Sequence, residues 1–538
     1  MVLRNIRYIY CLILFCYSTI LFSQEKEFIQ GKLQDAQTGE PVVFATIRIK
    51  DNAIGVISNQ DGGFRIPKKF KELGDVLVVS SMGYQKKEIP IESLSHNDVN
   101  IIRLSYGVLE LAEAVVTAKK KRQLSPRRIV RRALEAIPVN FSQNSFSTVG
   151  YYRDYQLNEE NEYINLNEAI IEVFDAGFDE LDHKTSRIRI YDYKKNTDFR
   201  RNHFAEQKYD YRTRRKIISN AFLSGYGGNE FIILRIHDAI RSYKVNSFDF
   251  VNTLEKDLLS NHSFFREEDL YLDDEILYTI GITKSVPASR VSNKLYITGY
   301  KVVGRLYISK NDFAIHGMEY TLYDNQNFNI NKKSNPSNPH GQPIFEVVTE
   351  YKRIYTKMYL NYISLHNLFR LKEEPKFIAE DITVDFSKKY FIVTFNTEPE
   401  ARSANILRNY KFKFKGRKLK FLRSELNKKR IVLYPDIEKA ELDAMFKEIE
   451  ENRKDGILNK DLLVAEIENI KDKEGNLLNE WTFKDYQQFR EYFVQRINQK
   501  AKPIPDSLLM KRNRPIFEDQ PIVKPDDFEE YWMNTPLK

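Results

Sequence analysis

Short runs of alternating apolar and polar residues follow one another through the first part of the chain. Residues 42–49, 55–58 and 75–80 each alternate in this way, and turn-forming residues separate them. Short strands at this spacing predict a small β-sandwich whose inward-facing residues form the core. Residues 59–63, Asn-Gln-Asp-Gly-Gly, supply side chains that tolerate positive φ in a turn, and Phe64 then returns the chain to the core.

The pattern changes to longer amphipathic strands, dense in tyrosine, between residues 146 and 375. Residues 149–155, 295–302, 304–308 and 317–323 are the clearest examples. Consecutive strands of this kind predict an antiparallel sheet with one solvated face. Apolar residues that recur every three or four positions predict helices within the same domain.

The last third of the chain returns to short strands at sandwich spacing. Residues 382–386, 390–395, 410–415 and 430–434 predict a second immunoglobulin-like β-sandwich, and residues 437–452 predict a helix inserted into it. Residues 483–538 are expected to comprise a helix and a proline-rich, extended tail. The predicted fold class is therefore mainly β and multidomain: an N-terminal sandwich, a central curved antiparallel sheet with helices, and a C-terminal sandwich.

Several motifs of the first domain resemble the carboxypeptidase regulatory-like domain. These are Gly31-Lys32-Leu33, the Thr-Gly-Glu-Pro-Val of residues 38–42, the turn at residues 59–64 and the Ser-Ser-Met-Gly-Tyr of residues 80–84. The resemblance implies an immunoglobulin- or transthyretin-like β-sandwich that carries no catalysis. The same domain occurs in TonB-dependent receptors, and residues 109–118 look like the segment that joins it to their plug, but no plug-like sequence follows. Residues 304–323 and 345–365 also resemble, in strand pattern alone, the lipid-holding sheet of outer-membrane lipoprotein carriers.

The N-terminus predicts export. Arg4 and Arg7 precede an apolar run at residues 9–22, which is followed by a polar segment, as in a secretory signal peptide. Cys11 and Cys16 are the two cysteines, so the exported chain is expected to lack thiols. We expect residues 1–23 to be the signal, with no transmembrane segment after its removal, and a periplasmic or outer-membrane-peripheral location in a Gram-negative bacterium. The expected domains are residues 24–118 (carboxypeptidase regulatory-like sandwich), 119–145 (basic linker and amphipathic helix), 146–375 (central sheet), 376–482 (second sandwich) and 483–538 (helix and tail).

The formal net charge of +9 is concentrated in two basic segments. Residues 408–430 form the second, which we interpret mainly as the wet face of a strand. The first basic segment is residues 117–132, where Ser125-Pro126 predicts the start of an amphipathic helix. Its apolar face would dock on the next domain, or its basic face would lie on an anionic membrane. The candidate binding patch of this segment consists of Lys119, Lys120, Lys121, Arg122, Arg127, Arg128, Arg131 and Arg132.

One set of residues could form the metal site of a zinc carboxypeptidase. His203 and Glu206 form a His-x-x-Glu motif, and His316 lies further along the chain. The residues around the motif are polar, whereas a zinc site needs ligands on rigid elements with a dry surround, so these three are weak metal candidates. The sequence shows no nucleophile elbow, zinc-binding His-Glu-x-x-His pair or phosphate-binding loop. We expect no catalytic residues and no cofactor.

These observations favour a non-enzymatic binding or scaffold protein of the cell envelope. Its tyrosines and phenylalanines, 32 and 35 in number, suggest a lipid or glycan held on the aromatic central sheet. The alternative is an accessory interaction module of an outer-membrane transport or secretion complex, and a zinc carboxypeptidase is a remote third. The expected partner is an envelope lipid, glycan or outer-membrane protein, and not a nucleic acid, because an exported protein meets little of it and neither basic segment belongs to a reader fold.

Overall fold

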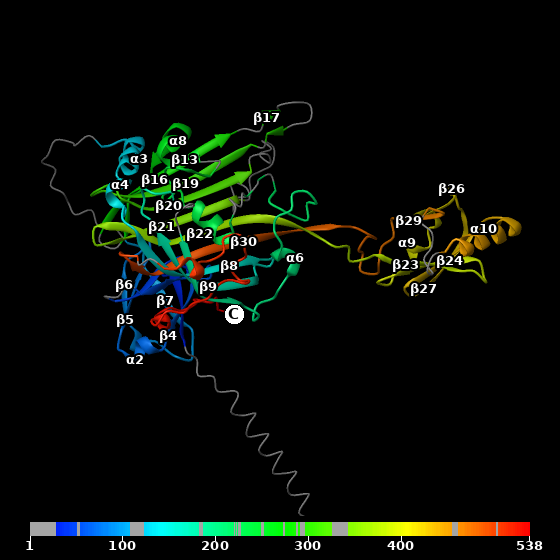
Figure 1. The fold of residues 1–538 in the computed structure, drawn as a ribbon, viewed down its shortest axis with the longest axis horizontal. Helices are drawn as coiled ribbons and strands as arrows, with labels where there is room; N and C mark the ends of the chain where they lie inside the picture. The colour runs from blue at the N-terminus through cyan, green and yellow to red at the C-terminus, as the bar shows by residue number, and fades with distance from the viewer. Residues whose placement is uncertain are drawn as a thin grey trace, which may run out of the picture. The chain divides into compact units, whose positions relative to one another are not determined.

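The structure is a computed structural model, and it describes most of the chain from residue 28 onward (Figure 1). The described ranges are 28–50, 54–107, 123–181, 187–219, 221, 223, 228–248, 252–272, 275–286, 289–290, 296–297, 299–324, 343–453, 461–501 and 504–537. The predicted signal, with both cysteines, therefore lies outside the described residues. The chain forms two compact units: residues 1–207, 218–369 and 486–538 make up the first, and residues 208–217 and 370–485 the second.

The first domain of the first unit is a β-sandwich of two sheets. One sheet has the order β4-β1-β7 and the other β3-β2-β5-β6, with β1 and β7 parallel and the other pairs antiparallel. Its elements are β1 (Phe28–Asp35), β2 (Thr46–Ile49), β3 (Gly55–Ile57), β4 (Gly63–Pro67), α2 (Lys69–Glu72), β5 (Val76–Ser80), β6 (Lys87–Pro90), the 3-10 turn η1 (Ile91–Ser93) and β7 (Asn100–Leu104). The alternation in the sequence thus becomes two sheets that face one common core, as predicted.

The turn between β3 and β4 adopts the predicted geometry. Gly62 has φ +76°, and a Cβ there would stand 2.4 Å from the Leu33 carbonyl oxygen, so this position requires glycine. Phe64 follows and is fully buried. The core that it joins contains one residue from the opposite end of the chain, Trp532, whose ring packs 5.7 Å from that of Phe70.

The central sheet has twelve strands and lies mostly in the first unit, whereas β11 and the adjoining ends of β22 and β30 belong to the second. Its order is β10-β9-β8-β30-β22-β21-β20-β19-β16-β14, and β11 and β15 pair at its sides with β22 and β16. The strands are β8 (Phe146–Leu157), β9 (Tyr163–Asp175), β10 (Arg187–Lys195), β11 (Lys216–Ile217), β14 (Ser263–Arg266), β15 (Leu270–Leu272), β16 (Glu275–Val286), β19 (Tyr300–Ser309), β20 (Ile315–Asp324), β21 (Pro343–Ile354), β22 (Lys357–Glu373) and β30 (Thr482–Asn498). Every register given for neighbouring strands of this sheet is antiparallel, as the sequence predicts.

Short helices, two small hairpins and the C-terminal tail accompany this sheet. The helices are α3 (Pro126–Glu135), α4 (Ile137–Asn140), α6 (His203–Glu206), α7 (Glu230–Ile236) and α8 (Leu254–Asn261). The hairpins pair β12 (Asn246–Phe248) with β13 (Asn252–Thr253) and β17 (Ser289–Arg290) with β18 (Tyr296–Ile297). The described part of the tail contains the 3-10 turns η3 (Asp506–Leu508) and η4 (Phe528–Glu530), with further turns at residues 512–513, 516–517 and 526–527.

The two faces of the sheet are covered by different parts of the chain. Tyr151 and Tyr152 are successive residues of β8, so their rings point to opposite faces. Tyr152 meets Phe231 of α7 edge to face, with ring centroids 5.2 Å apart. On the other face Tyr151 stacks near Phe493, against which Phe44 of the first domain also packs. The sheet is therefore sandwiched between helices and the N-terminal domain.

Buried polar contacts tie the first domain, the sheet and the tail together. Arg153 on β8 is fully buried and pairs with Glu491 on β30, and its guanidinium also donates to the Asn59 side chain in the turn of the first domain. Asn534 in the tail donates to the Ile57 carbonyl oxygen at 2.8 Å and accepts from the Arg65 amide at 2.8 Å. The tail thus acts as a strap across the edge of the first domain.

The structure contradicts one predicted element. A helix is expected within residues 483–538, but residues 482–498 form β30, a strand near the middle of the central sheet. β30 pairs with β8 over eleven residue pairs, from Gln487↔Leu157 to Asn498↔Ser147. Ladder hydrogen bonds to a strand more than 300 residues away outweigh the helix propensity of its Gln, Glu, Arg and Lys residues.

The second unit contains a β domain of two sheets with an inserted helix. The sheets have the orders β23-β24-β28-β27 and β26-β25-β29. Its elements are β23 (Ala379–Asp385), β24 (Tyr390–Phe395), α9 (Ala401–Ala404), η2 (Leu407–Asn409), β25 (Tyr410–Phe414), β26 (Arg417–Lys418), β27 (Phe421–Asn427), β28 (Arg430–Pro435), α10 (Lys439–Glu451) and β29 (Leu463–Ile467). The inserted helix falls where the sequence predicts it, and its buried residues Met445, Phe446 and Ile449 join the core between the sheets.

Candidate functional site

Helix α3 begins as the sequence predicts, with Pro126 at its first position. Its apolar residues Ile129, Val130, Ala133 and Leu134 are buried. This side of the helix packs on β14, β19 and α8. The docking interpretation of the amphipathic pattern is therefore correct for the apolar side of the helix.

The opposite side of α3 carries four exposed arginines, Arg127, Arg128, Arg131 and Arg132. None of them makes an ion pair with a residue that the structure describes. Arg132 lies over the Phe313 ring, 5.2 Å from its centroid, which leaves its charge unneutralised. The other four predicted patch residues, Lys119, Lys120, Lys121 and Arg122, lie outside the described residues.

Two exposed apolar side chains lie where α3 continues into α4. Val139 of α4 is 69% exposed, and Tyr355, in the tight turn between β21 and β22, is 84% exposed. The Lys357 amine donates to the Val139 carbonyl oxygen at 2.5 Å, so α4 and this turn are direct neighbours. Asn140 further anchors α4 through a 3.1 Å hydrogen bond to the Asp312 carbonyl oxygen.

The backbone at Tyr355 is unusual for a bulky residue. Its φ is +54°, in the left-handed region that asparagine and glycine occupy readily in two-residue hairpin turns. A tyrosine here is strained and also leaves most of its ring in solvent. Folding alone favours neither property, so both are reasons to look for a contact that the ring makes outside this chain.

We call the set Arg127, Arg128, Arg131, Arg132, Val139, Tyr355 and Lys357 the basic face. It presents guanidinium groups that can each hydrogen-bond a phosphate, together with an aromatic ring of amphipathic character. The patch residues on α3 follow from the sequence. Val139 and Tyr355 do not, because single apolar residues in short connections carry no periodic signal.

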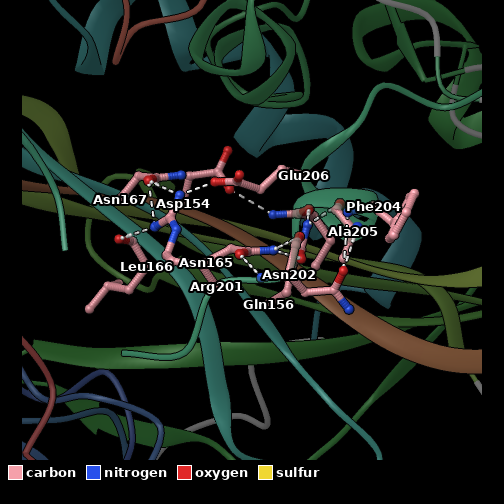
Figure 2. A network of polar contacts seen from close by, with 11 residues as sticks. Asp154, Gln156, Asn165, Leu166, Asn167, Arg201, Asn202, Phe204, Ala205 and Glu206 are labelled. Carbon is pink, nitrogen blue, oxygen red and sulfur yellow. Dashed lines mark hydrogen bonds and ion pairs between the residues drawn. The ribbon is translucent and has the colours of Figure 1, made fainter. Parts of the chain in front are cut away.

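The first pair of metal candidates belongs to a local hydrogen-bonding network (Figure 2). α6 is capped by Asn202, whose side-chain oxygen accepts from the amides of Phe204 and Ala205 at 3.1 and 3.3 Å. Glu206 forms an ion pair with Arg201, as Figure 2 shows. The carboxylate of the His-x-x-Glu motif is thus engaged by an arginine, and the motif forms a single capped helical turn.

The third candidate, His316, belongs to a different network. Its Nε2 atom lies 3.0 Å from Glu275, which also pairs with Arg353. Within the described part of the chain, no three His, Cys, Asp or Glu side chains are placed to hold one metal ion. The described residues therefore do not unite His203, Glu206 and His316 in a common site.

The same described part of the chain contains no helix that is both long and apolar enough to span a bilayer.

Comparisons with known proteins bear mainly on the first domain. The family model of the CarboxypepD_reg-like domain matches residues 29–116. The TonB-dependent receptor SusC of Bacteroides thetaiotaomicron is 40% identical over 63 residues, which are 12% of this chain and 6% of the receptor. The chain thus matches only a small fraction of the length of this curated relative.

Two solved structures align with larger parts of the chain at low similarity. A LolA superfamily protein from Nitrosomonas europaea has a TM-score of 0.18 at 12% identity, covering 46% of this chain and 86% of that protein. A DUF1329 family protein from Desulfovibrio piger has a TM-score of 0.21 at 12% identity, covering 45% and 87%. These values carry no argument about function. The comparison that does identify a part of the molecule is that of its first domain, because residues 29–116 match the model of the CarboxypepD_reg-like domain.

Proposed function

We propose that this chain is a binding or scaffold protein of the bacterial cell envelope, and that its basic face lies on an anionic membrane surface. The observation that carries the proposal is the set of four exposed, unpaired arginines on α3 next to exposed Val139 and Tyr355. Exposed basic groups attract anionic headgroups, and an adjoining tyrosine is suited to the boundary between headgroups and acyl chains. The predicted signal peptide supports export to such a location.

The basic face should contribute several kcal/mol to the free energy of membrane binding. Each basic residue near an anionic leaflet contributes about 1 kcal/mol, so the four arginines together contribute about 4 kcal/mol, or roughly a thousandfold in affinity. Partial burial of the Tyr355 ring adds about 1 to 2 kcal/mol. The electrostatic part is screened by salt, because the guanidinium groups lie in solvent.

Co-sedimentation with vesicles tests this proposal. The chain without residues 1–23 should bind vesicles of phosphatidylcholine mixed with phosphatidylglycerol, and bind phosphatidylcholine alone far more weakly. Replacing Arg127, Arg128, Arg131 and Arg132 by glutamine should weaken binding by about a hundredfold or more. The matched control removes four exposed charges from the second unit, at Lys413, Arg417, Lys418 and Lys420, and should change binding little. Equal loss in both variants would show that net charge, and not the basic face, governs binding.

Tyr355→Asn separates the contribution of the exposed ring from folding. Asparagine accepts the left-handed backbone of this turn, so the melting temperature should stay the same or rise. Affinity for the mixed vesicles should nevertheless fall by about tenfold. Unchanged affinity would exclude the ring from the membrane contact.

A finer form of the hypothesis places a lipid or glycan on the aromatic central sheet. The largest fully buried side chains include Tyr151, Tyr152, Tyr155, Tyr351 and Tyr492 of the sheet. These rings fill the layers between the sheet and its covering segments, which makes the basic face the better-supported place for lipid. Native mass spectrometry of gently extracted protein tests the sheet form, since a ligand held there would co-purify.

The alternative of an accessory module in a transport assembly is supported by the similarity of the first domain to a TonB-dependent receptor. Protein-free vesicles distinguish the two functions. Binding to native outer membranes combined with no binding to anionic vesicles would favour the accessory module. Binding to both, lost together in the four-arginine variant, would favour the membrane surface.

A further inference from the structure

A polar cavity lies between the N-terminal sandwich and the central sheet, away from the residues of the basic face. Its volume is about 260 Å³. Strand β2 contributes Arg48 to its wall, whereas β21 contributes Glu350 and Lys352 and β20 contributes His316. A space of this size exceeds what one or two water molecules occupy and approaches that of a small-ligand site.

The two carboxylates of the cavity already have partners. Glu275 accepts from Arg353 Nε and from His316 Nε2, each at 3.0 Å. These contacts, led by the His316 hydrogen bond, lower the pKa of Glu275 to about 2. Glu350 accepts from the Asn361 amide at 2.8 Å, and Asn361 also reaches Thr46 of the N-terminal domain at 2.9 Å. The acidic groups are therefore occupied by contacts within the wall.

Lys352 differs from them, because its amine has no hydrogen bond or ion pair with any residue that the structure describes. Burial, together with the positive charge of Arg48, lowers its pKa to about 7, although the Glu350 carboxylate opposes this shift. The cavity thus holds an amine that forms no ion pair with the described residues. Its wall also holds His316, 5% exposed, whose Nδ1 atom is buried without a hydrogen-bond partner.

We propose that this cavity binds a small oxyanion, the phosphate or carboxylate group of a soluble ligand, with Lys352 as its direct cationic partner and Arg48 beside it. An anion there would receive charge-assisted hydrogen bonds and would compensate the unpaired charge of the Lys352 amine. The unpartnered His316 nitrogen can contact a polar group on the body of the ligand. The walls belong to two domains, so binding would also hold the N-terminal sandwich against the sheet.

Proton uptake is a direct consequence of this arrangement. The charged amine binds the oxyanion, so at a pH above about 7 binding must first protonate Lys352. Affinity should fall by about tenfold for each pH unit above that value. The groups around the amine are Arg48, Glu350, Arg353, Glu275 and His316, and the paired carboxylate of Glu275 stays charged throughout this range.

Calorimetric titration of the chain without residues 1–23 with inorganic phosphate tests the proposal. One phosphate should bind at pH 6, with affinity at least about tenfold weaker at pH 8.5. Lys352→Met should abolish binding, whereas Lys352→Arg should keep it and remove the part of its pH dependence that comes from protonation of the amine, because arginine stays charged. Lys86→Met, which removes an exposed lysine of the first domain, is the matched control and should bind as the unmodified chain does.

A second probe, dihexanoyl phosphatidic acid below its micellar concentration, distinguishes the source of the phosphate. Binding of phosphate alone identifies a free oxyanion, and tighter binding of the lipid probe identifies a phosphate that carries an apolar body. The proposal is overturned if neither probe binds, or if Lys352→Met binds phosphate as well as the Lys86→Met control does. Matching melting temperatures of the Lys352 variants exclude misfolding as the cause of a loss.

Discussion

The interior of the first unit and the sandwich of residues 370–485 are stabilised by different kinds of contact. Arg153 and Glu491 are fully buried in the first unit, and the partners of Arg153 lie 338 and 94 residues away in sequence. In the sandwich, the buried polar residues among those described are Asn409 and Asp472. Asp472 is satisfied mainly by its own turn, as in the 2.8 Å contact from the amide of Asn476.

This difference has a consequence for cooperativity. A buried charge is tolerated only while its partner is in place, so the first domain, the sheet and the tail must assemble together. The sandwich has a core of aromatic and aliphatic residues from strands that all lie within residues 379–467, and its ion pairs lie at the surface. We expect the first unit to lose stability sharply when one long-range polar partner is removed, and the sandwich to be more tolerant.

Breaking the buried ion pair should have the largest effect. Arg153→Met leaves Glu491 buried without its cation and should lower the free energy of unfolding of the first unit by about 3 to 5 kcal/mol. Trp481 and Trp532 are the two tryptophans of the chain and belong to different units. In a Trp481→Phe background, urea unfolding followed by Trp532 fluorescence therefore reports on the first unit alone. Adding Glu491→Leu to Arg153→Met should restore part of the loss, and an equal or greater loss would argue against the pair as its cause.

Removing the polar anchor of the tail should have the next largest effect. Asn534→Ala leaves the Arg65 amide and the Ile57 carbonyl without their partner and should cost about 1 to 3 kcal/mol, measured by the same fluorescence assay. Asn452→Ala, which alters an exposed helix end in the second unit, is the control. If both variants unfold at the same urea concentration as the parent, the tail does not strap the first domain.

Mild acid should destabilise the first unit more than the sandwich, by a smaller amount than the substitutions above. Burial lowers the pKa of both His237 and His366 to about 4. Below pH 6.5 each of these histidines is protonated in the unfolded chain, whereas in the folded chain it stays neutral down to about pH 4. The free energy of unfolding therefore keeps its full contribution from these histidines above pH 6.5 and decreases as the pH falls from 6.5 towards 4. The cost is about 1 kcal/mol for each histidine over one pH unit.

Residues 370–485 contain no histidine, so the sandwich lacks this source of acid sensitivity. Hydrogen exchange measured between pH 6.5 and 5.5, corrected for intrinsic rates, should show β8 and β30 losing protection while β24 and β28 keep theirs. His366→Phe should reduce the loss, since phenylalanine can stack on Phe489 as His366 does at 4.4 Å and does not titrate. Equal losses of protection in both regions would contradict the expected difference in acid sensitivity.

A surface ion pair of the sandwich should have the smallest effect. Lys411 of β25 pairs with Glu468, the residue after β29, and both side chains are more than 40% exposed. Lys411→Gln should therefore change the stability of the sandwich by at most about 1 kcal/mol. Hydrogen exchange of β25 checks this value, and a loss as large as that of Arg153→Met would remove the distinction between the two regions.

Sequence patterns predict the elements of the sandwich better than those of the first unit, because more of the contacts in the first unit join segments that are far apart in sequence. In the sandwich the predicted strands and the inserted helix lie where alternation and helical spacing place them, and all its strands lie within residues 379–467. In the first unit, residues 482–498 depart from the predicted helix, since their partners β8 and β22 are remote in sequence. The basic side of α3 was readable as a run of arginines, but the exposed Tyr355 beside it was not.

Local sequence patterns were enough to predict the mainly β class, the CarboxypepD_reg-like motifs, the glycine turn before Phe64 and the amphipathic character of α3, because each depends on residues within a single element. The contact of Trp532 with the first core, the pairing of Arg153 with Glu491 and the shared cavity of Lys352 and Arg48 follow from tertiary structure alone. The physical reason is that local patterns record which side of an element is apolar. The partner of a buried charge, in contrast, is chosen by the assembly of segments that can lie hundreds of residues apart.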